Sequence, residues 1–247
     1  MAWYTDLKNK VLPLSGYMGK SIYRIIPFDV LLSMISEKKN VLVKTKKWED
    51  AYENFLFKEN FVVNGNQWSI SSLQEQLYGQ CWTLRKSSDA MWRIYSSNKK
   101  SVRIRSTVGA LWDSINNCTD GKCLMGEVQY FPQAQICDDL VNGAPYSIDS
   151  LTDLLIYSQF VKRNSFSHEA EYRAIFFADN TSDSDVQEFD IDPFDFIKSI
   201  YFDPRADDAY VARCKKILTT VFKFPAKRIS KSTLYQFKPS TLLVQLQ

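Results

Sequence analysis

The hydrophobic positions of this chain fall into short runs that change between a period of two and a period of about 3.6. In the segment 27–40, for example, Phe28, Leu31 and Ile35 stand at helical spacing. The period-two or continuously apolar runs predict strands at 21–26, 41–45, 80–84, 101–106, 124–130, 169–177, 197–202 and 228–234. The other periodic runs predict helices at 27–40, 70–78, 88–95, 108–115, 147–161 and 207–221, with a helical turn around 55–56. This alternation is typical of an α+β fold.

No linker rich in proline or glycine interrupts the alternation, and no segment repeats another. A chain of 247 residues, of which 45% are hydrophobic and 24% charged, is long enough for one large domain. We therefore expect residues 1–247 to form a single α+β domain. No stretch has the order of a signal peptide, and no apolar run approaches the roughly 18 residues of a membrane span. A cytoplasmic location without a membrane partner is the resulting expectation.

Cysteine and histidine usage excludes several kinds of site. The five cysteines are an odd number in a sizeable chain, so we expect reduced thiols and no disulfide. His168 is the only histidine, which excludes a zinc site with two histidine ligands. Cys118 and Cys123 lie near each other in the sequence, but no second cysteine pair accompanies them, and we predict no metal site. The chain also lacks a Gly-x-Ser-x-Gly elbow, a Walker loop and a Gly-x-Gly-x-x-Gly turn. Carboxylate and arginine chemistry remains.

The net charge of +3 is too small to indicate nucleic-acid binding by itself. Basic residues cluster locally at 38–39, 44–47 and 103–105, and such clusters are usually solvated faces.

The run 167–177 carries the most specific chemistry. A period of two places Glu169, Glu171 and Arg173 on one face of a strand that becomes apolar further along. Such a strand can enter the core from the rim of a cleft, where two carboxylates and a guanidinium can polarise a hydroxyl or stabilise a developing cation. The alternative is a surface ion pair at a strand end, since exposed ion pairs are common and weak.

Five motifs together resemble a widespread bacterial family of unknown function. They are Tyr23-Arg24, the segment 48–53, the segment 91–95, Glu169-Ala170-Glu171-Tyr172-Arg173 and the segment 201–206. The family more typically shows Phe-Asn-Asp-Pro-Phe-Glu at the second motif. Asp50 and Glu53 match it, whereas Trp48, Glu49, Ala51 and Tyr52 depart from it.

A more remote resemblance is to ADP-ribosyltransferases of the arginine-serine-glutamate type. These enzymes have an aromatic-Arg pair on an early strand, a Ser or Thr on a middle strand and a Glu-x-Glu entering a late strand. Tyr23-Arg24, Trp82-Thr83 and Glu169-Ala170-Glu171 occur here in that order, although the family usually has a longer Ser-Thr-Ser run at the middle position. The resemblance implies a split or twisted central sheet flanked by helices, and NAD as the substrate.

The same resemblance implies roles for individual residues. Glu171 would hold a ribose hydroxyl and stabilise the cationic transition state, and Glu169 would orient or deprotonate the acceptor. Arg24 would bind the pyrophosphate or its ribose, and Thr83 would order the site. Trp92 or Tyr95 would stack on the nicotinamide or on an acceptor base, or would be ordinary core residues.

The expected acceptor is a macromolecule: the aromatic and basic residues favour nucleic acid over a small molecule, with a protein as the other choice. By analogy with bacterial transferases, the resemblance also implies a toxin or phage-defence effector with an antitoxin or regulator protein as partner. One alternative is a non-catalytic regulatory module of the same fold that binds protein or nucleic acid. Another is a metal-dependent nuclease that uses Asp50, Glu53, Glu169 and Glu171, although its usual spacing is absent.

Overall fold

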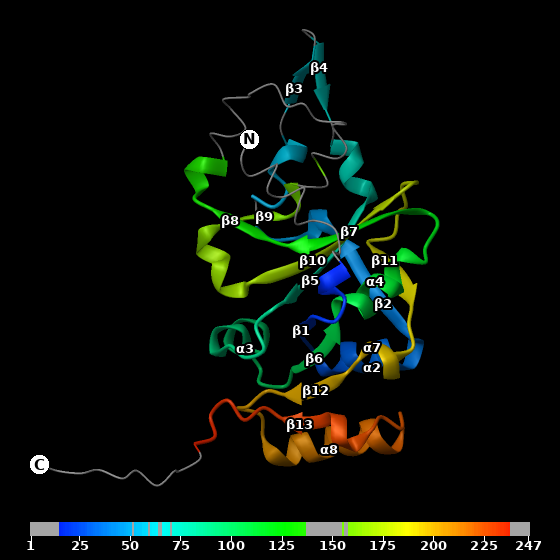
Figure 1. Ribbon diagram of the computed structural model, residues 1–247, viewed down its shortest axis with the longest axis vertical. Helices are drawn as coiled ribbons and strands as arrows, with labels where there is room; N and C mark the ends of the chain where they lie inside the picture. Colours follow the sequence, from blue (N-terminus) through cyan, green and yellow to red (C-terminus); the bar gives the residue numbers. More distant parts are fainter. Residues whose placement is uncertain are drawn as a thin grey trace, which may run out of the picture.

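The computed structural model describes residues 15–50, 52–58, 60–63, 66–69, 71–136, 155 and 158–237 (Figure 1). A nine-stranded mixed sheet forms its centre, with helices packed around it. The predicted α+β class, with a central sheet flanked by helices, is confirmed. Its strands are β1 (Ser21–Ile26), β2 (Lys39–Lys44), β5 (Leu77–Thr83), β6 (Val102–Thr107), β7 (Gly121–Glu127), β10 (Glu171–Ala178), β11 (Val186–Asp190), β12 (Ser199–Phe202) and β13 (Ile229–Lys231). Two small pairs lie outside it: β3 (Asn60–Val63) with β4 (Asn66–Ser69), and β8 (Gln129–Phe131) with β9 (Val161–Arg163).

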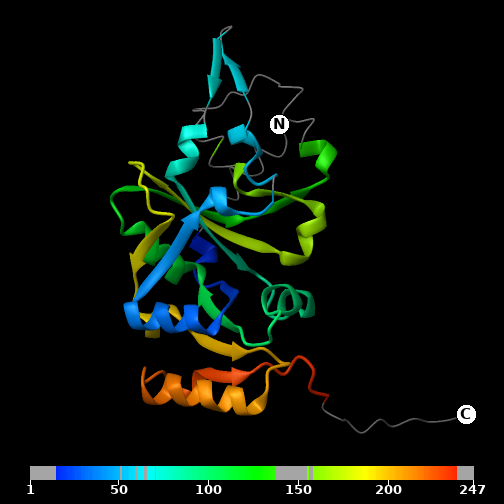
Figure 2. The ribbon, with the colours of Figure 1, turned by 180° about the vertical axis from the view of Figure 1, so that it is seen from behind.

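The described α-helices are α2 (Phe28–Glu37), α3 (Asp89–Tyr95), α4 (Val108–Asn116), α7 (Pro193–Phe196) and α8 (Asp208–Thr220). The 3-10 helices are η1 (Ser15–Tyr17), η2 (Thr45–Lys47), η3 (Phe55–Lys58), η4 (Ser71–Gln76), η5 (Asn164–Glu169) and η6 (Ala226–Arg228). Ser88 and Thr107 cap α3 and α4, each accepting a hydrogen bond from a backbone N–H three residues on. Helix α8 runs along β13 at the end of the molecule opposite the β3–β4 hairpin (Figures 1 and 2).

The sheet splits at β5. One edge of β5 pairs with β10 over its whole length, from Leu77 opposite Phe177 to Thr83 opposite Glu171. Two strands share the other edge: β2 pairs near Gly79, and β1 pairs at Thr83. β1 and β2 therefore diverge beside residues 80–82, and the split central sheet implied by the resemblance is confirmed.

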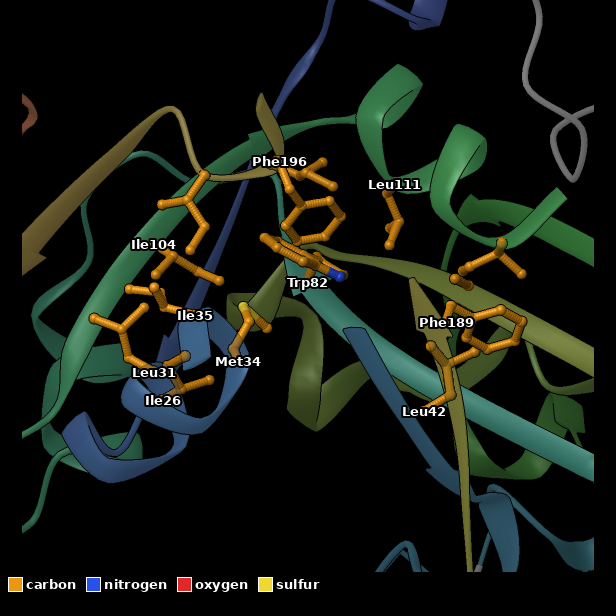
Figure 3. Close-up of a cluster of buried hydrophobic side chains, with 14 of the residues drawn as sticks. Ile26, Leu31, Met34, Ile35, Leu42, Trp82, Ile104, Leu111, Phe189 and Phe196 are labelled. Atoms are coloured by element: carbon orange, nitrogen blue, oxygen red, sulfur yellow. The ribbon is translucent and has the colours of Figure 1, made fainter. Parts of the chain in front are cut away.

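A large apolar cluster fixes this arrangement. The α2 side chains Leu31 and Ile35 point toward Ile104 of β6 (Figure 3). Trp82 of β5 meets Phe196 of α7 edge-on, with ring centroids 6.0 Å apart. Burial of apolar surface stabilises a fold by about 25 cal/mol per Å². The contacts within this cluster therefore contribute most of the stability that holds the diverging strands in place.

Several element boundaries differ from those predicted. Lys38 adopts a left-handed conformation (φ 55°) that ends α2, and β2 begins at Lys39, so that Asn40 is a buried strand residue rather than a helix end. The helix predicted at 70–78 was wrong: a 3-10 turn ends at Gln76, and β5 begins at Leu77. The helix predicted at 147–161 lies mostly outside the described residues, and Val161 belongs to β9.

Two basic residues predicted on solvated faces are buried. Lys44 is 2% exposed and donates to Glu75 and to the carbonyl of Ser182. Arg103 is 5% exposed and lies against aromatic rings from three segments, those of Tyr23, Trp92 and Tyr201. The sequence pattern failed here because distant side chains supply the compensating contacts.

The described cysteines Cys81, Cys118, Cys123 and Cys214 are free thiols, and Cys137 lies outside the described residues. Burial raises the pKa of Cys123 to about 12, which makes it a poor nucleophile. We predict five titratable thiols in the protein denatured without reductant, and no bound zinc by metal analysis. Fewer than five thiols, or one equivalent of zinc, would contradict this prediction.

In the part of the chain that the structure describes, no helix is both long and apolar enough to cross a membrane.

Candidate active site

A cavity of about 200 Å³ opens where β1 and β2 diverge from β5. It is lined by Tyr23, Arg24, Ile25, Val43, Trp48, the segment 79–83, Met91, Tyr95, Glu169 and Glu171. Six of the seven predicted site residues are in this set, although they come from distant parts of the chain. The seventh, Trp92, is 0% exposed and packs near Arg103. A fully buried ring has no free face for a ligand, so Trp92 is a core residue.

Arg24 is the unpaired cation of the cavity. It lies in the middle of β1, half-buried, and within the described part of the chain its guanidinium has no hydrogen bond or ion pair. Burial lowers the pKa of Arg24, but an arginine side chain stays protonated in proteins. A half-buried guanidinium without a counter-ion is suited to bind an anion, and its planar donors match a phosphate or carboxylate.

Glu169 and Glu171 are brought together by a left-handed turn. Glu169 ends η5, and Ala170 follows with φ 43° before β10 begins at Glu171. The sequence suggested that the two carboxylates share one face of a continuous strand. The turn at Ala170 shows instead that only Glu171 lies on the strand. The two carboxylates nevertheless converge on one ammonium group: Lys162 Nζ lies 2.6 Å from Glu169 Oε2 and 2.8 Å from Glu171 Oε1.

Hydrogen bonds from neighbouring segments fix this turn. Thr83 Oγ1 donates to the carbonyl oxygen of Glu169 at 2.5 Å and accepts from the N–H of Arg85 at 3.1 Å. The N–H of Glu171 donates to the Tyr130 hydroxyl at 2.9 Å. Thr83 therefore orders the backbone that carries the two carboxylates.

The carboxylate of Glu171 belongs to a buried ionic cluster. Arg173 is 0% exposed; its Nε donates to Glu171 Oε2 at 2.5 Å, and its other nitrogens donate to the Gln159 carbonyl and to Glu53. The Arg173 guanidinium also lies 4.6 Å from the centre of the Trp48 ring. Three carboxylates, those of Glu53, Glu169 and Glu171, thus share two cations, Lys162 and Arg173.

The surroundings of the two carboxylates of the cavity shift their pKa values in opposite directions. Burial raises the pKa of Glu169, and the neighbouring Glu171 adds to this effect while Lys162 opposes it. Burial acts in the same direction on Glu171, but Arg173 and Lys162 outweigh it and hold the pKa of Glu171 well below its ordinary value. Glu171 is therefore the more acidic member of the pair, and Glu169 takes up a proton more readily.

Tyr95 lies at the rim of the cavity. The residue is 44% exposed, and its hydroxyl donates to Glu169 Oε1 at 2.8 Å. Burial of the hydroxyl and the adjacent Glu169 both raise the pKa of Tyr95, which keeps it a hydrogen-bond donor.

No sequence pattern indicated Lys162, which directly follows the segment 147–161 that was expected to be helical and precedes the predicted strand at 169–177. Glu53 was named only as a match to a family motif and as a carboxylate of the nuclease alternative, and Trp48 only as a departure from that motif. The structure also shows why position 79 is a glycine: a Cβ there would lie 2.4 Å from an atom of the Trp48 ring. The remaining member of the motif, Asp50, pairs with Arg163 at 2.9 Å.

The nuclease alternative receives no support from this geometry. Asp50 and Glu53 are held by Arg163 and Arg173, and among the described residues no group of three or more histidine, cysteine or carboxylate side chains is arranged to hold a metal ion. That the protein holds no metal stays a prediction.

A second cavity, of about 450 Å³, also reaches Glu171. Its lining includes Tyr17, Glu127, Gln129 and Tyr130, and it contains no lysine or arginine.

Comparisons with known proteins give a family match and a structural likeness. Residues 91–174 match the model of the family described as "Protein of unknown function (DUF2971)". The match starts at the Met91-Trp92 motif and ends just after Arg173, so the predicted resemblance to a family of unknown function is confirmed over about a third of the chain. No curated protein matches the sequence significantly.

Among solved structures, the chain is similar to the DarT protein of Thermus sp. 2.9 in complex with NAD+, at 11% identity and a TM-score of 0.39, covering 86% of this chain and 95% of DarT. For DarT in complex with ADP-ribosylated single-stranded DNA, the identity is 12%, the TM-score is 0.40, and the coverages are 90% and 97%. Likenesses of this degree assign no ligand and no activity to the present chain.

Proposed function

We propose that this protein binds NAD in the cavity between β1, β2 and β5, and that it transfers ADP-ribose to a macromolecular acceptor. The proposal rests on one observation: Arg24, which has no partner in the described part of the chain, lines the same cavity as Glu169 and Glu171. Glu171 is held ionised, and Glu169 can take up a proton. Each group matches one chemical demand of the reaction.

The first demand is to hold the dianionic pyrophosphate of the substrate. NAD carries two phosphate groups, and the Arg24 guanidinium has no counter-ion in the described part of the chain. A planar fork of donors can hold one phosphate by two parallel hydrogen bonds, which strengthens binding and fixes orientation.

The second demand is to stabilise a cation that exists only in the transition state. When the bond between the ribose C1′ and the nicotinamide nitrogen breaks, its electron pair leaves with nicotinamide and positive charge develops on the ribose. Glu171, held ionised by Arg173 and Lys162, can stabilise this charge. An acceptor oxygen or nitrogen then supplies the electron pair of the new bond to C1′, and its proton passes to Glu169.

Nucleic acid remains the acceptor that we propose first. The second cavity at Glu171 offers an entry for it, because its tyrosines can stack on a base while Gln129 and Glu127 bond to the base edge. A role as a toxin or phage-defence effector, controlled by an antitoxin or regulator, also belongs to this proposal.

Incubation with NAD labelled in the adenylate phosphate tests the function. We expect the wild-type protein to transfer label to single-stranded DNA, to RNA or to protein in a cell extract, with nuclease and protease digestion distinguishing the acceptors. If the wild-type protein neither binds NAD nor labels a macromolecule, the non-catalytic module becomes the better explanation.

That alternative rests on a specific observation. Every carboxylate oxygen of Glu169 and Glu171 already has a protein donor, as in a purely structural ionic cluster. The basic surface expected for such a module is reduced, however, because Lys44 and Arg103 are buried and Lys46 and Lys47 are ion-paired.

Substitution of Arg24 by lysine should weaken NAD binding by roughly tenfold or more, because a single ammonium replaces a bidentate donor. Calorimetric titration with NAD measures the effect. The matched control is Arg93→Lys, which changes an exposed arginine on α3 that pairs with Asp89. Equal affinities for Arg24→Lys and the wild type would exclude Arg24 from the binding site.

A further inference from the structure

Lys162 contacts all three carboxylates of the ionic cluster. Its Nζ lies 2.6 Å from Glu169, 2.8 Å from Glu171 and 3.3 Å from Glu53. The lysine side chain is 8% exposed and each glutamate side chain 6% exposed, so solvent does little to screen these contacts.

The three carboxylates do not depend on Lys162 equally. Glu53 and Glu171 also receive hydrogen bonds from Arg173. In the described part of the chain, Glu169 contacts no cation except Lys162, and its other oxygen accepts from the neutral Tyr95 hydroxyl. Removal of the ammonium group would thus leave Glu171 charged and paired, but would leave Glu169 buried without a cation.

We propose that Lys162 is a positioning residue that separates the roles of the two carboxylates. It holds both in the cavity and supplies the positive charge that allows Glu169 to ionise and accept a proton. The inference rests on the proposed function in one respect only: the proton that Glu169 accepts comes from the acceptor of ADP-ribose.

The pH dependence follows from the groups that face Glu169. These are Tyr95 of α3, Lys162 of β9 and Glu171 of β10. Arg173 and Glu53 contact Glu171 and Lys162 in turn. Loss of the lysine charge favours the protonated form of Glu169. An opposite charge in contact with a carboxyl typically changes its pKa by one to three units. The acid limb of the pH–rate profile should therefore move to higher pH.

The test compares nicotinamide release from NAD, in the presence of acceptor, as a function of pH. For Lys162→Met we expect the acid limb to shift upward by about one to two pH units, with activity recovering at high pH, and for Lys162→Arg a limb close to that of the wild type. Lys47→Met, which removes an exposed lysine paired with Asp185, is the matched control and should leave the limb unchanged. A loss that is equal at every pH, or an arginine variant that behaves like the methionine variant, would overturn the inference.

A second measurement is independent of NAD chemistry. In protein labelled with ¹³C at the glutamate carboxyl carbon, the Glu169 signal, assigned through Glu169→Gln, should titrate at a higher pH in Lys162→Met than in the wild type. An unchanged midpoint would refute the role of Lys162, whereas a shifted midpoint in a protein that never cleaves NAD would refute only the proposed function. If Lys162→Met does not fold, Lys162→Met/Glu53→Gln removes one cation and one anion together and allows the same comparison.

Discussion

Replacing Arg173 with methionine should lower the free energy of unfolding by about 3–5 kcal/mol, because one partner of a buried ion pair disappears while the other stays buried. Arg173 is 0% exposed and donates to Glu171, to Glu53 and to the Gln159 carbonyl. After the change, Lys162 alone would compensate three carboxylates. For a domain of this size, the loss corresponds to a melting temperature lower by about 10 °C.

The effect should depend on pH with a definite sign. Arg173 holds the pKa of Glu171 below its unfolded value, so the pair stabilises the fold above about pH 4.3 and loses this contribution as pH falls through the lower folded pKa. The difference between wild type and Arg173→Met should therefore shrink in acid. Urea unfolding at pH 7, and at a series of acid pH values falling well below about 4, where Glu171 takes up its proton in the folded protein, measures it. Arg93→Met, at an exposed site, is the control and should change stability little at any of these pH values. A loss of stability as small as that of the control would mean that the ionic cluster contributes little to the stability of the fold.

The sequence predicted those parts of the fold in which local pattern and environment agree. β1 was predicted residue by residue from its short apolar run. α3 and α4 were predicted to within one or two residues, because each helix has a regular apolar period and a capping Ser or Thr. β5 was placed three residues too late at its start. Both of its faces are buried, so Leu77, Tyr78 and Gly79 show no alternation and merge with the preceding turn.

The candidate site was predicted in part for similar reasons. Arg24, Thr83 and Glu171 lie on regular strands. The order of their motifs along the chain was sufficient to predict that they share one cavity. The turn at Ala170 was missed, since a left-handed alanine has no sequence signature. Lys162 and Glu53 were missed because their importance arises only from contacts with Arg173 and the two glutamates, which lie up to 120 positions away along the chain. A buried cluster of charges is visible only after the fold has assembled it.

Replacing Glu171 with glutamine should lower ADP-ribose transfer by roughly 10² or more, equivalent to about 3 kcal/mol of transition-state stabilisation. The amide keeps the shape of the side chain but removes the charge that opposes the ribosyl cation. NAD binding should survive, because Arg24 and the rest of the cavity are unchanged and the cation does not exist in the ground state. Single-turnover transfer from labelled NAD, together with calorimetric binding, separates the two quantities.

The control for this prediction comes from the same cluster. Glu53 is as buried as Glu171 and contacts the same two cations, Lys162 and Arg173, but it does not line the cavity. Glu53→Gln should therefore destabilise the fold about as much as Glu171→Gln while leaving most of the activity. If both variants lose activity in proportion to stability, the charge of Glu171 serves the fold rather than the reaction. If Glu171→Gln alone loses activity and still binds NAD, the carboxylate acts on the transition state.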